Sequence, residues 1–401
     1  MIPSALTDEI VAPSDPLYAR LAAAARLGLL PGWQPVDFLR GDRLFTRREL
    51  APLLEKLPPK TEILVLGNEP RAFAYGPGWQ VQATKHGITA AELSTSWRGW
   101  ELSAGRKPLR WGPGWTGGML FSDSAPPLDR IGVSKRFGSI TFEQFYGQYF
   151  EPEDLSAPKD TASGTRRHLA GRRLTFQNSG PWEISAGEAI KALRLPDPAF
   201  AAALPWYVYE HDWSALGSGR WLGLPRSAAY KNSLWLNYMA DLSVSYRQKD
   251  GTHFFAEYLL DDIKAPAFLG GVKTTPQRTG LLLGAAGVRG PLAWRVETLD
   301  TNRRTYRSEA QANWWNQGDS PLGHPAGPNA SVLFARTDYK ASAHLSVALE
   351  AEQRRRRDAS QLGPTPLNRL TLFVSTTLTP QAFATARLER DGARLTLGWI
   401  P

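Results

Sequence analysis

Strand-length runs in which apolar and polar residues alternate recur from about residue 78 to the C-terminus, and they constrain the fold more than any other feature of the chain. In the clearest run, 236–247, Leu, Tyr, Ala and Val alternate with Asn, Asp and Ser, and the runs 292–298 and 345–352 repeat the pattern. Successive side chains of a strand point to opposite faces, so each run predicts a strand with one apolar and one polar face. The sequence therefore predicts an all-β fold.

The length of the alternating region favours a large antiparallel transmembrane β-barrel. Roughly 340 residues follow residue 60, and at about 20 residues for a strand with its connection they give about 16–18 strands. No stretch approaches the roughly 18 uncharged apolar residues of a transmembrane helix. A mean hydropathy of −0.33 suits a barrel in which only every second residue meets lipid. A soluble β-sandwich would also alternate, but at this length it would have to divide into several domains, so we disfavour it.

The predicted connections are of unequal length, as in outer-membrane barrels, which have short turns at the periplasmic end and long loops outside. The tight turns are 248–251, 289–291 and 390–392. The long connections are 151–164, 193–230, 262–276 and 316–329. If successive connections are assigned alternately to the two ends from the N-terminal side, the connection 316–329 lies in the periplasm. Counting back from Pro401 places it outside.

Residues 1–59 predict a short N-terminal helical segment before a barrel at 60–401. The Ala- and Leu-rich stretch 16–27 precedes a glycine, and Thr46 and Glu49 form a capping box before a second helix that ends at two prolines. This pair resembles part of an S-layer homology repeat, and equally the helical N-terminal piece of some outer-membrane barrels. Residues 1–12 lack the basic start and apolar core of a signal peptide, which is the main objection to the predicted outer-membrane location.

Three segments are too particular for composition to explain. They are LRWGPGWTGGMLFSDSAPPL at 109–128, FFAEYLLDD at 254–262 and SPLGHPAGPNA at 320–330. Together they resemble the capsule assembly Wzi family, the first and third being the more specific. The resemblance implies an outer-membrane β-barrel with a helical N-terminal region, acting as a lectin that holds capsular polysaccharide at the cell surface. It implies neither an enzyme activity nor a cofactor.

The candidate polysaccharide-binding residues are aromatic, arginine and histidine side chains on the predicted loops and strand ends. Indole faces cover the apolar faces of sugars, and arginine binds carboxylates in a two-pronged fashion. The candidates are Arg110, Trp111, Trp115, Trp206, Tyr207, Tyr209, Trp213, Trp221, Trp314, Trp315, His324, Arg354 and Arg355. The alternatives are a structural loop that plugs the barrel for the motif at 110–115, and a membrane-interface girdle or loop packing for the other aromatics. For the arginine run 354–357, lipid phosphates and a solvated strand end are the alternatives.

The sequence shows no motif that indicates one of the other functional classes. The six histidines have no close metal-ligand spacing and the chain has no Cys, so we predict no metal. No phosphate-binding loop, nucleophile elbow or dinucleotide fingerprint occurs. Asp261 and Asp262 are adjacent on a predicted strand and so point to opposite faces, which rules out a paired-carboxylate glycosidase site. The net charge of +9 is spread among acidic residues, which predicts a mixed-charge lumen rather than a nucleic-acid site.

We therefore predict a non-enzymatic outer-membrane lectin without a cofactor, which helps to attach or assemble surface polysaccharide. Its expected partners are surface or capsular polysaccharide and outer-membrane lipid, with cell-wall polymer as a further candidate through the N-terminal segment. Two alternatives stay open. One is a porin-like channel for sugars or ions, and the other is a tether between the outer membrane and cell-wall polymer.

Overall fold

The alternating runs form the strands of one 18-stranded antiparallel sheet in the computed structural model of the protein. This number lies within the range predicted from chain length. The structure describes residues 17–26, 29–30, 33, 38, 45, 50, 53, 63–66, 71–76, 79–84, 87–150, 166–177, 180–192, 236–261, 278–307, 314–317, 320–342, 344–357, 367–379, 382–390 and 392–399.

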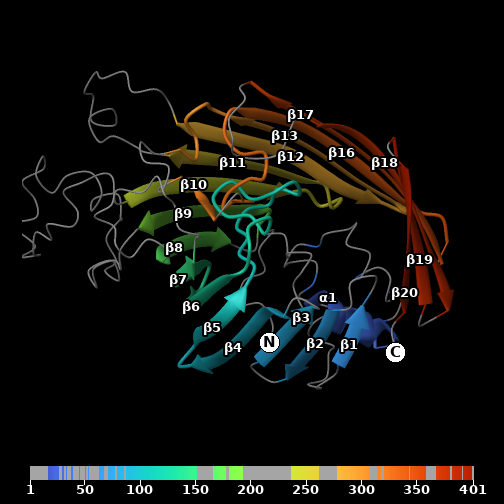
Figure 1. Cartoon of the computed structure of the whole chain (residues 1–401), viewed down its shortest axis with the longest axis horizontal. Helices are drawn as coiled ribbons and strands as arrows, with labels where there is room; N and C mark the ends of the chain where they lie inside the picture. Colours follow the sequence, from blue (N-terminus) through green and yellow to red (C-terminus); the bar gives the residue numbers. More distant parts are fainter. Residues whose placement is uncertain are drawn as a thin grey trace, which may run out of the picture.

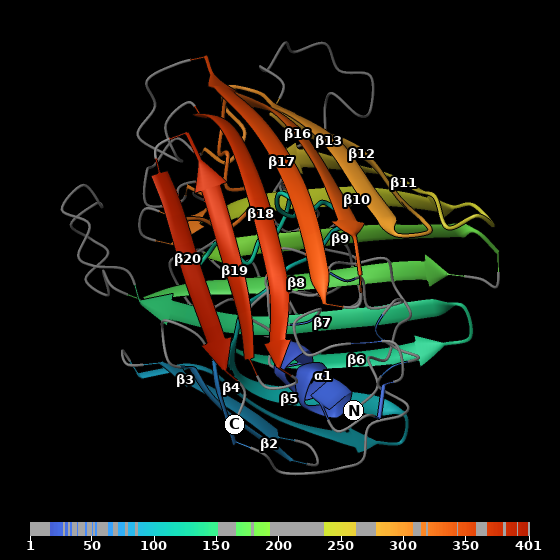
Figure 2. The same cartoon turned by 90° about the vertical axis from the view of Figure 1, so that its right-hand side faces the viewer.

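The sheet is a meander in which each strand pairs with the next one along the chain. Its strands are β1 (Ile63–Leu66), β2 (Arg71–Gly76), β3 (Trp79–Thr84), β4 (Gly87–Trp97), β5 (Trp100–Lys107), β6 (Leu128–Phe137), β7 (Ile140–Phe150), β8 (Arg166–Gln177), β9 (Trp182–Ala192), β10 (Leu236–Arg247), β11 (His253–Asp261), β12 (Thr279–Arg289), β13 (Leu292–Thr301), β16 (Ala330–Lys340), β17 (Leu345–Arg356), β18 (Leu367–Thr379), β19 (Ala382–Glu389) and β20 (Gly392–Trp399). A separate ribbon of β14 (Asn316–Gln317) and β15 (Ser320–Pro321) lies in the connection before β16. The sheet curls round into a barrel, and β20 comes into contact with β1 without a backbone pairing between their described residues (Figures 1 and 2).

The connections divide by length between the two ends of the barrel. One end carries the short connections 77–78, 98–99, 138–139, 178–181, 248–252, 290–291, 341–344 and 380–381. The other end carries every long one, 108–127, 151–165, 193–235, 262–278, 302–329 and 357–366, together with the shorter connections 67–70, 85–86 and 390–391. The connection containing β14 and β15 thus lies with the other long ones, as the count back from Pro401 predicts. In outer-membrane barrels the long loops are extracellular, so we call this end the extracellular end.

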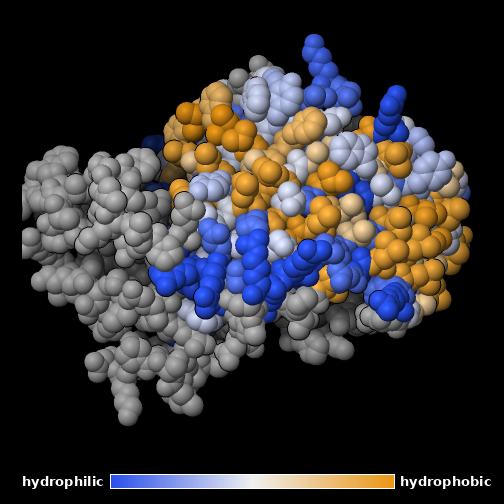
Figure 3. Space-filling model, turned by 90° about the horizontal axis from the view of Figure 1, so that it is seen from above, coloured by the Kyte–Doolittle hydropathy of each residue, from blue (hydrophilic) through white to orange (hydrophobic). Residues whose placement is uncertain are grey.

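The apolar face of the strands is the exposed one. On β10, Leu242 is 47% exposed, whereas the neighbouring Asp241 and Ser243 are both 4% exposed. Side chains on β11 alternate between buried and partly or fully exposed along the whole strand. This is the reverse of a soluble protein, and a continuous apolar outer surface is stable only against lipid. Figure 3 shows such apolar patches over the outer surface.

Aromatic side chains ring the barrel at its short-turn end. They are exposed on the outer face at Trp79, Trp97, Phe137, Phe176, Trp182, Phe254 and Tyr339. Each lies at or next to the strand terminus that adjoins a short connection. Aromatic belts of this kind mark the level of the lipid headgroups, so this end lies at one membrane interface.

Two of the long connections fold into the barrel and fill its middle. We call their described residues, 108–127, 302–307, 314–317 and 320–329, the plug. Plug side chains pack with wall residues of β6–β16 in one buried cluster. The members from the plug are Trp111, Met119, Leu120, Phe121, Tyr306, Trp315, Leu322 and Ala326. The first connection is the teal trace inside the ring of strands in Figure 1.

The N-terminal segment contains one described helix, α1 (Leu17–Arg26), at the stretch predicted to be helical. It lies beside the first strands of the sheet (Figures 1 and 2) and buries Tyr18 and Leu21 against Phe38 and Phe45. Leu50, from the second predicted helix, belongs to the same cluster, but most of that helix lies outside the described residues. No described helix is long and apolar enough to cross a membrane. The proposed division of the chain at residues 59 and 60 remains a prediction.

Candidate functional site

Two buried carboxylates on the barrel wall hold the motif at 110–115 and the residues that follow it. Glu297 on β13 accepts hydrogen bonds from the backbone N–H groups of Trp115 and Thr116, the second at 2.9 Å, and from the Thr116 hydroxyl at 2.9 Å. Glu257 on β11 accepts one from the backbone N–H of Met119 at 2.8 Å. Both carboxylates come from the polar face of the alternating strands, so the same pattern that builds the wall also supplies the anchors for the plug.

Arg110 binds other residues of its own connection, 108–127. Its guanidinium lies 2.5 Å from the Asp123 carboxylate and donates to the carbonyl oxygens of Gly114 and Trp115, the latter at 2.9 Å. The glycines allow the backbone to turn this tightly. A Cβ atom on Gly118 would lie 1.9 Å from the carbonyl oxygen of Trp111, a distance that no real Cβ contact reaches. Arg110 is 7% exposed, so the structure places it inside the plug.

Trp111 belongs to the aromatic core of the plug. Its ring meets Phe121 at 5.0 Å and Phe145 at 5.6 Å, both edge-on, and the residue is 3% exposed. A sugar platform needs an open ring face, which Trp111 lacks here. Of the two readings that the sequence left open for this motif, the structural loop plugging the barrel fits this placement.

Trp115 is half-buried and faces the wall formed by β13 and β16. The guanidinium groups of Arg295 and Arg336 lie 4.9 and 5.4 Å from its ring centroid, and its ring stacks on Phe334 at 6.3 Å. Cation–π contacts of this kind are stronger where water is excluded. Trp115 therefore joins the plug to the charged wall.

The second inward connection locks onto the first through three buried side chains. Trp315 donates from Nε1 to the carbonyl oxygen of Leu120 at 2.8 Å, and the Tyr306 hydroxyl donates to the carbonyl oxygen of Met119 at 2.6 Å. Nε2 of His324 lies 3.0 Å from the Thr116 hydroxyl of the first connection, and its Nδ1 accepts from the backbone N–H of Ala326 at 3.1 Å. Trp315 and His324 are both 0% exposed, so both of these candidates also lie within the plug.

The tautomer of His324 follows from its partners. Because Nδ1 accepts a hydrogen bond, Nε2 carries the proton and donates to the Thr116 hydroxyl at 3.0 Å, which in turn donates to Glu297. Burial, with the positive charges of Arg354 and Arg110 nearby, lowers the pKa of His324 from 6.5 to about 3. The ring is neutral at physiological pH and links the two halves of the plug.

The inner faces of β16, β17 and β18 carry alternating charges. Arg336 bridges to Glu350 at 2.9 Å, and Arg369 bridges to Glu350 at 3.0 Å and to Glu352 at 2.7 Å. Arg354 points inward as well and pairs with Glu352 at 2.5 Å. This is the mixed-charge lumen expected from the sequence, and it engages Arg354 in an ion pair. Arg355, the next residue, points to the outer face and is exposed.

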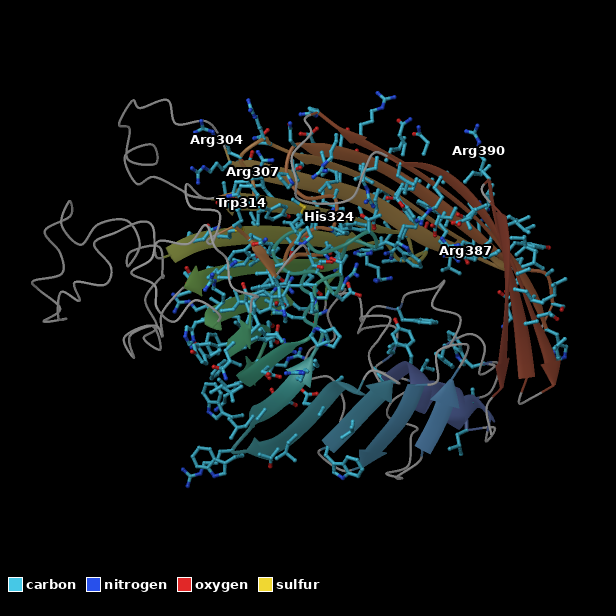
Figure 4. The ribbon with its side chains drawn as sticks, viewed as in Figure 1. Arg304, Arg307, Trp314, His324, Arg387 and Arg390 are labelled. Carbon is cyan, nitrogen blue, oxygen red and sulfur yellow. The ribbon has the colours of Figure 1, made fainter. Side chains whose placement is uncertain are left out.

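Trp314 lies at the extracellular end of the plug beside Arg307, which the sequence reasoning missed together with Arg304. The Arg307 guanidinium is 5.4 Å from the Trp314 ring centroid, and Arg304 is exposed in the same short segment (Figure 4). The Lys191 ammonium donates to the carbonyl oxygen of Trp314 at 2.8 Å and so fixes the segment to β9. A cluster of arginines directly after the predicted strand 292–298 was the signal that would have pointed to them.

The remaining candidates form the aromatic group of the longest connection. Trp206, Tyr207, Tyr209, Trp213 and Trp221 lie outside the described residues. Their role in binding stays a prediction. Within the part of the chain that the structure describes, no group of three or more His, Asp or Glu side chains is placed to hold a metal ion.

An antiparallel sheet curled into a barrel, with an apolar outer face and a filled interior, defines an outer-membrane β-barrel with a plugged lumen. Among solved structures, the chain is similar to Wzi of Escherichia coli, an outer-membrane protein involved in group 1 capsule assembly and described as a carbohydrate-binding β-barrel. The TM-score is 0.60 at 14% sequence identity, over 98% of this chain and 99% of that one. At this identity the likeness shows a shared fold.

Other outer-membrane barrels match less well. They are OccK10 of Pseudomonas aeruginosa, with a TM-score of 0.45 at 9% identity over 84% of this chain and 88% of that one, and OmpT of Vibrio cholerae, with a TM-score of 0.41 at 10% identity over 85% and 95%. No family model matches the sequence, and no curated protein matches it.

Proposed function

We propose that the protein is an outer-membrane lectin that binds a surface polysaccharide at its extracellular end and breaks no bond in it. The observation that carries the proposal is the plug. Two inward connections share one buried core, the first is bonded to Glu257 and Glu297 of the wall, and the second donates from the backbone N–H of Tyr306 to Asp261 of β11 at 2.6 Å. We infer that a barrel filled in this way holds a fixed surface at its extracellular end and does not serve to pass solutes.

The binding surface that we propose is built on Trp314 with Arg304 and Arg307. The indole offers a flat apolar face for a pyranose ring, and guanidinium groups bind sugar carboxylates or phosphates through paired hydrogen bonds. Two wall side chains fix the segment 314–316. The Lys191 ammonium donates to the carbonyl oxygen of Trp314, and the Tyr149 hydroxyl donates to that of Asn316 at 2.9 Å. A fixed platform loses little entropy on binding, and a repeating polymer adds many weak contacts.

The likeness to Wzi supports a carbohydrate ligand, because that barrel of similar fold and length is described as carbohydrate-binding. The porin-like alternative requires an open path, and the packing of Trp111, Trp315 and His324 counts against it. In this proposal the buried residues of the motif at 110–115 support the plug, and residues at the extracellular end contact the sugar.

Binding of the refolded protein to an array of purified bacterial capsular and O-antigen polysaccharides tests the proposal. We expect wild type to bind at least one anionic polysaccharide, and Trp314→Ala to lose most of that binding. The matched control is Trp182→Ala, because Trp182 is an exposed tryptophan on the lipid-facing side at the opposite end. Equal binding by wild type and Trp314→Ala would place the sugar site elsewhere, and binding to no polysaccharide would contradict a lectin function.

A further inference from the structure

The outer faces of β13, β16, β17 and β18 change from apolar to polar within one step of the strand register. On the lipid-facing side of three of these strands, the outward side chains are Leu333, Leu349 and Leu370, which are 58%, 46% and 59% exposed. The row of Leu333 is already mixed, because Leu333 pairs in register with Gln353, whose side-chain amide donates to Asn368 at 3.2 Å. The apolar band of the barrel therefore ends here.

One row further out, Asp300, Ser331 and Arg355 pair in register across β13, β16 and β17. The step between such rows is two residues, or about 7 Å along the strand. Arg357, at the end of β17, reaches back to Asp300 in an ion pair whose members are both about half exposed, at 52% and 50%. Two guanidinium groups thus stand directly above the end of the lipid-facing surface.

We propose that Arg355 and Arg357 form a binding site for the phosphate groups of an outer-leaflet lipid. A cation at this height meets headgroups rather than acyl chains, and guanidinium binds phosphate through two parallel hydrogen bonds. Leu333 and Leu370, below the arginines, offer the surface on which the acyl chains of the same lipid lie. The lipid is held by its head and its chains together.

Strand alternation separates this site from the lumen of the barrel. Arg355 lies on the outer face of β17, whereas its neighbour Arg354 points inward and pairs with Glu352. The run of arginines at 354–357 is therefore divided between two environments by strand alternation. Asp300 holds the Arg357 guanidinium at the surface, while among the described residues no carboxylate forms an ion pair with Arg355.

Lipid binding to the folded protein in neutral detergent, followed by native mass spectrometry, tests the site. The probe is diphosphoryl lipid A, compared with the same lipid after enzymatic dephosphorylation. We expect the phosphorylated form to bind more tightly. Arg355→Gln should weaken its binding about fivefold, which corresponds to about 1 kcal/mol for one basic residue at an anionic lipid surface. Arg355→Gln/Arg357→Gln should weaken it further, and Arg355→Lys should retain part of it.

The matched control is Arg289→Gln, because Arg289 is an exposed arginine on the outer face of β12 at the short-turn end. It should bind the lipid as wild type does. Heat-modifiable migration on gels confirms that each variant is folded. Unchanged binding in the double variant, an equal loss in Arg289→Gln, or no preference for the phosphorylated lipid would each overturn the proposal. Displacement of the lipid by millimolar inorganic phosphate would also overturn it, because it would identify a site for free phosphate.

Discussion

The carboxylate of Glu297 accepts the backbone N–H of Thr116 at 2.9 Å, across 181 residues of sequence. This bond joins the wall strand β13 to the inward loop. A side chain on the polar face of an alternating strand thus anchors the plug. His324 donates to the hydroxyl of the same threonine, so both inward connections meet at one residue.

Removing the anchor should loosen the plug. Glu297→Ala leaves the buried N–H groups of Trp115 and Thr116 without their acceptor, and each unsatisfied donor costs about 1–3 kcal/mol. We expect a lower midpoint of thermal unfolding in detergent and faster hydrogen exchange over 109–127. Glu101→Ala is the control, because the Glu101 carboxylate accepts a long 3.4 Å hydrogen bond from the Ser134 hydroxyl. Unchanged exchange in Glu297→Ala would show that the wall carboxylate does not hold the loop.

Gly118 should tolerate no side chain. Alanine there would meet the carbonyl oxygens of Trp111 and Phe121 at 1.9 and 2.2 Å, so the loop would have to move. We expect Gly118→Ala to cost about 3 kcal/mol or more, at the upper end of overpacking effects. Gly138→Ala is the comparison, since a Cβ there meets nothing within 4 Å and the cost is that of the left-handed backbone alone, about 1–2 kcal/mol. Equal unfolding midpoints for the two variants would contradict the close approach.

The free energy of unfolding should decrease as the pH is lowered, because His324 takes up a proton in the unfolded chain. Its pKa is near 6.5 when unfolded and about 3 when folded, so below pH 6.5 the unfolded chain binds more protons and is favoured. The expected loss by pH 5 is about 2 kcal/mol. Unfolding midpoints of wild type and His324→Gln between about pH 7.5 and pH 5 measure it. The variant should lose less stability than wild type over this range, and parallel curves would show that this histidine is not the titrating group.

Trp111 should matter for stability and not for sugar binding. Trp111→Ala removes a ring from the core shared with Phe121 and Phe145, and such truncations cost about 3–5 kcal/mol. We expect a lower unfolding midpoint, with polysaccharide binding by the folded fraction unchanged. Loss of binding at full stability would instead assign Trp111 a direct contact with the sugar.

Alternation predicted the strands 236–247, 292–298 and 345–352 and their apolar faces, because period two follows from the backbone alone. It could not tell that Glu257 and Glu297 hold the plug, since alternation fixes the face of a side chain and not its partner 138 or 182 residues away. The Arg110 motif was visible as unusual, yet its role depended on these distant carboxylates. Counting ends from the N-terminal side failed for the 316–329 loop because one misjudged strand reverses every later assignment.

Single-channel conductance of the refolded protein in a planar bilayer tests the plugged barrel most directly. The protein should insert without steady open-channel steps, and Glu297→Ala should show bursts of conductance as the anchored loop opens. Stable open-channel steps in wild type would contradict the plug and favour a porin, and failure to insert in any lipid would contradict the membrane barrel itself.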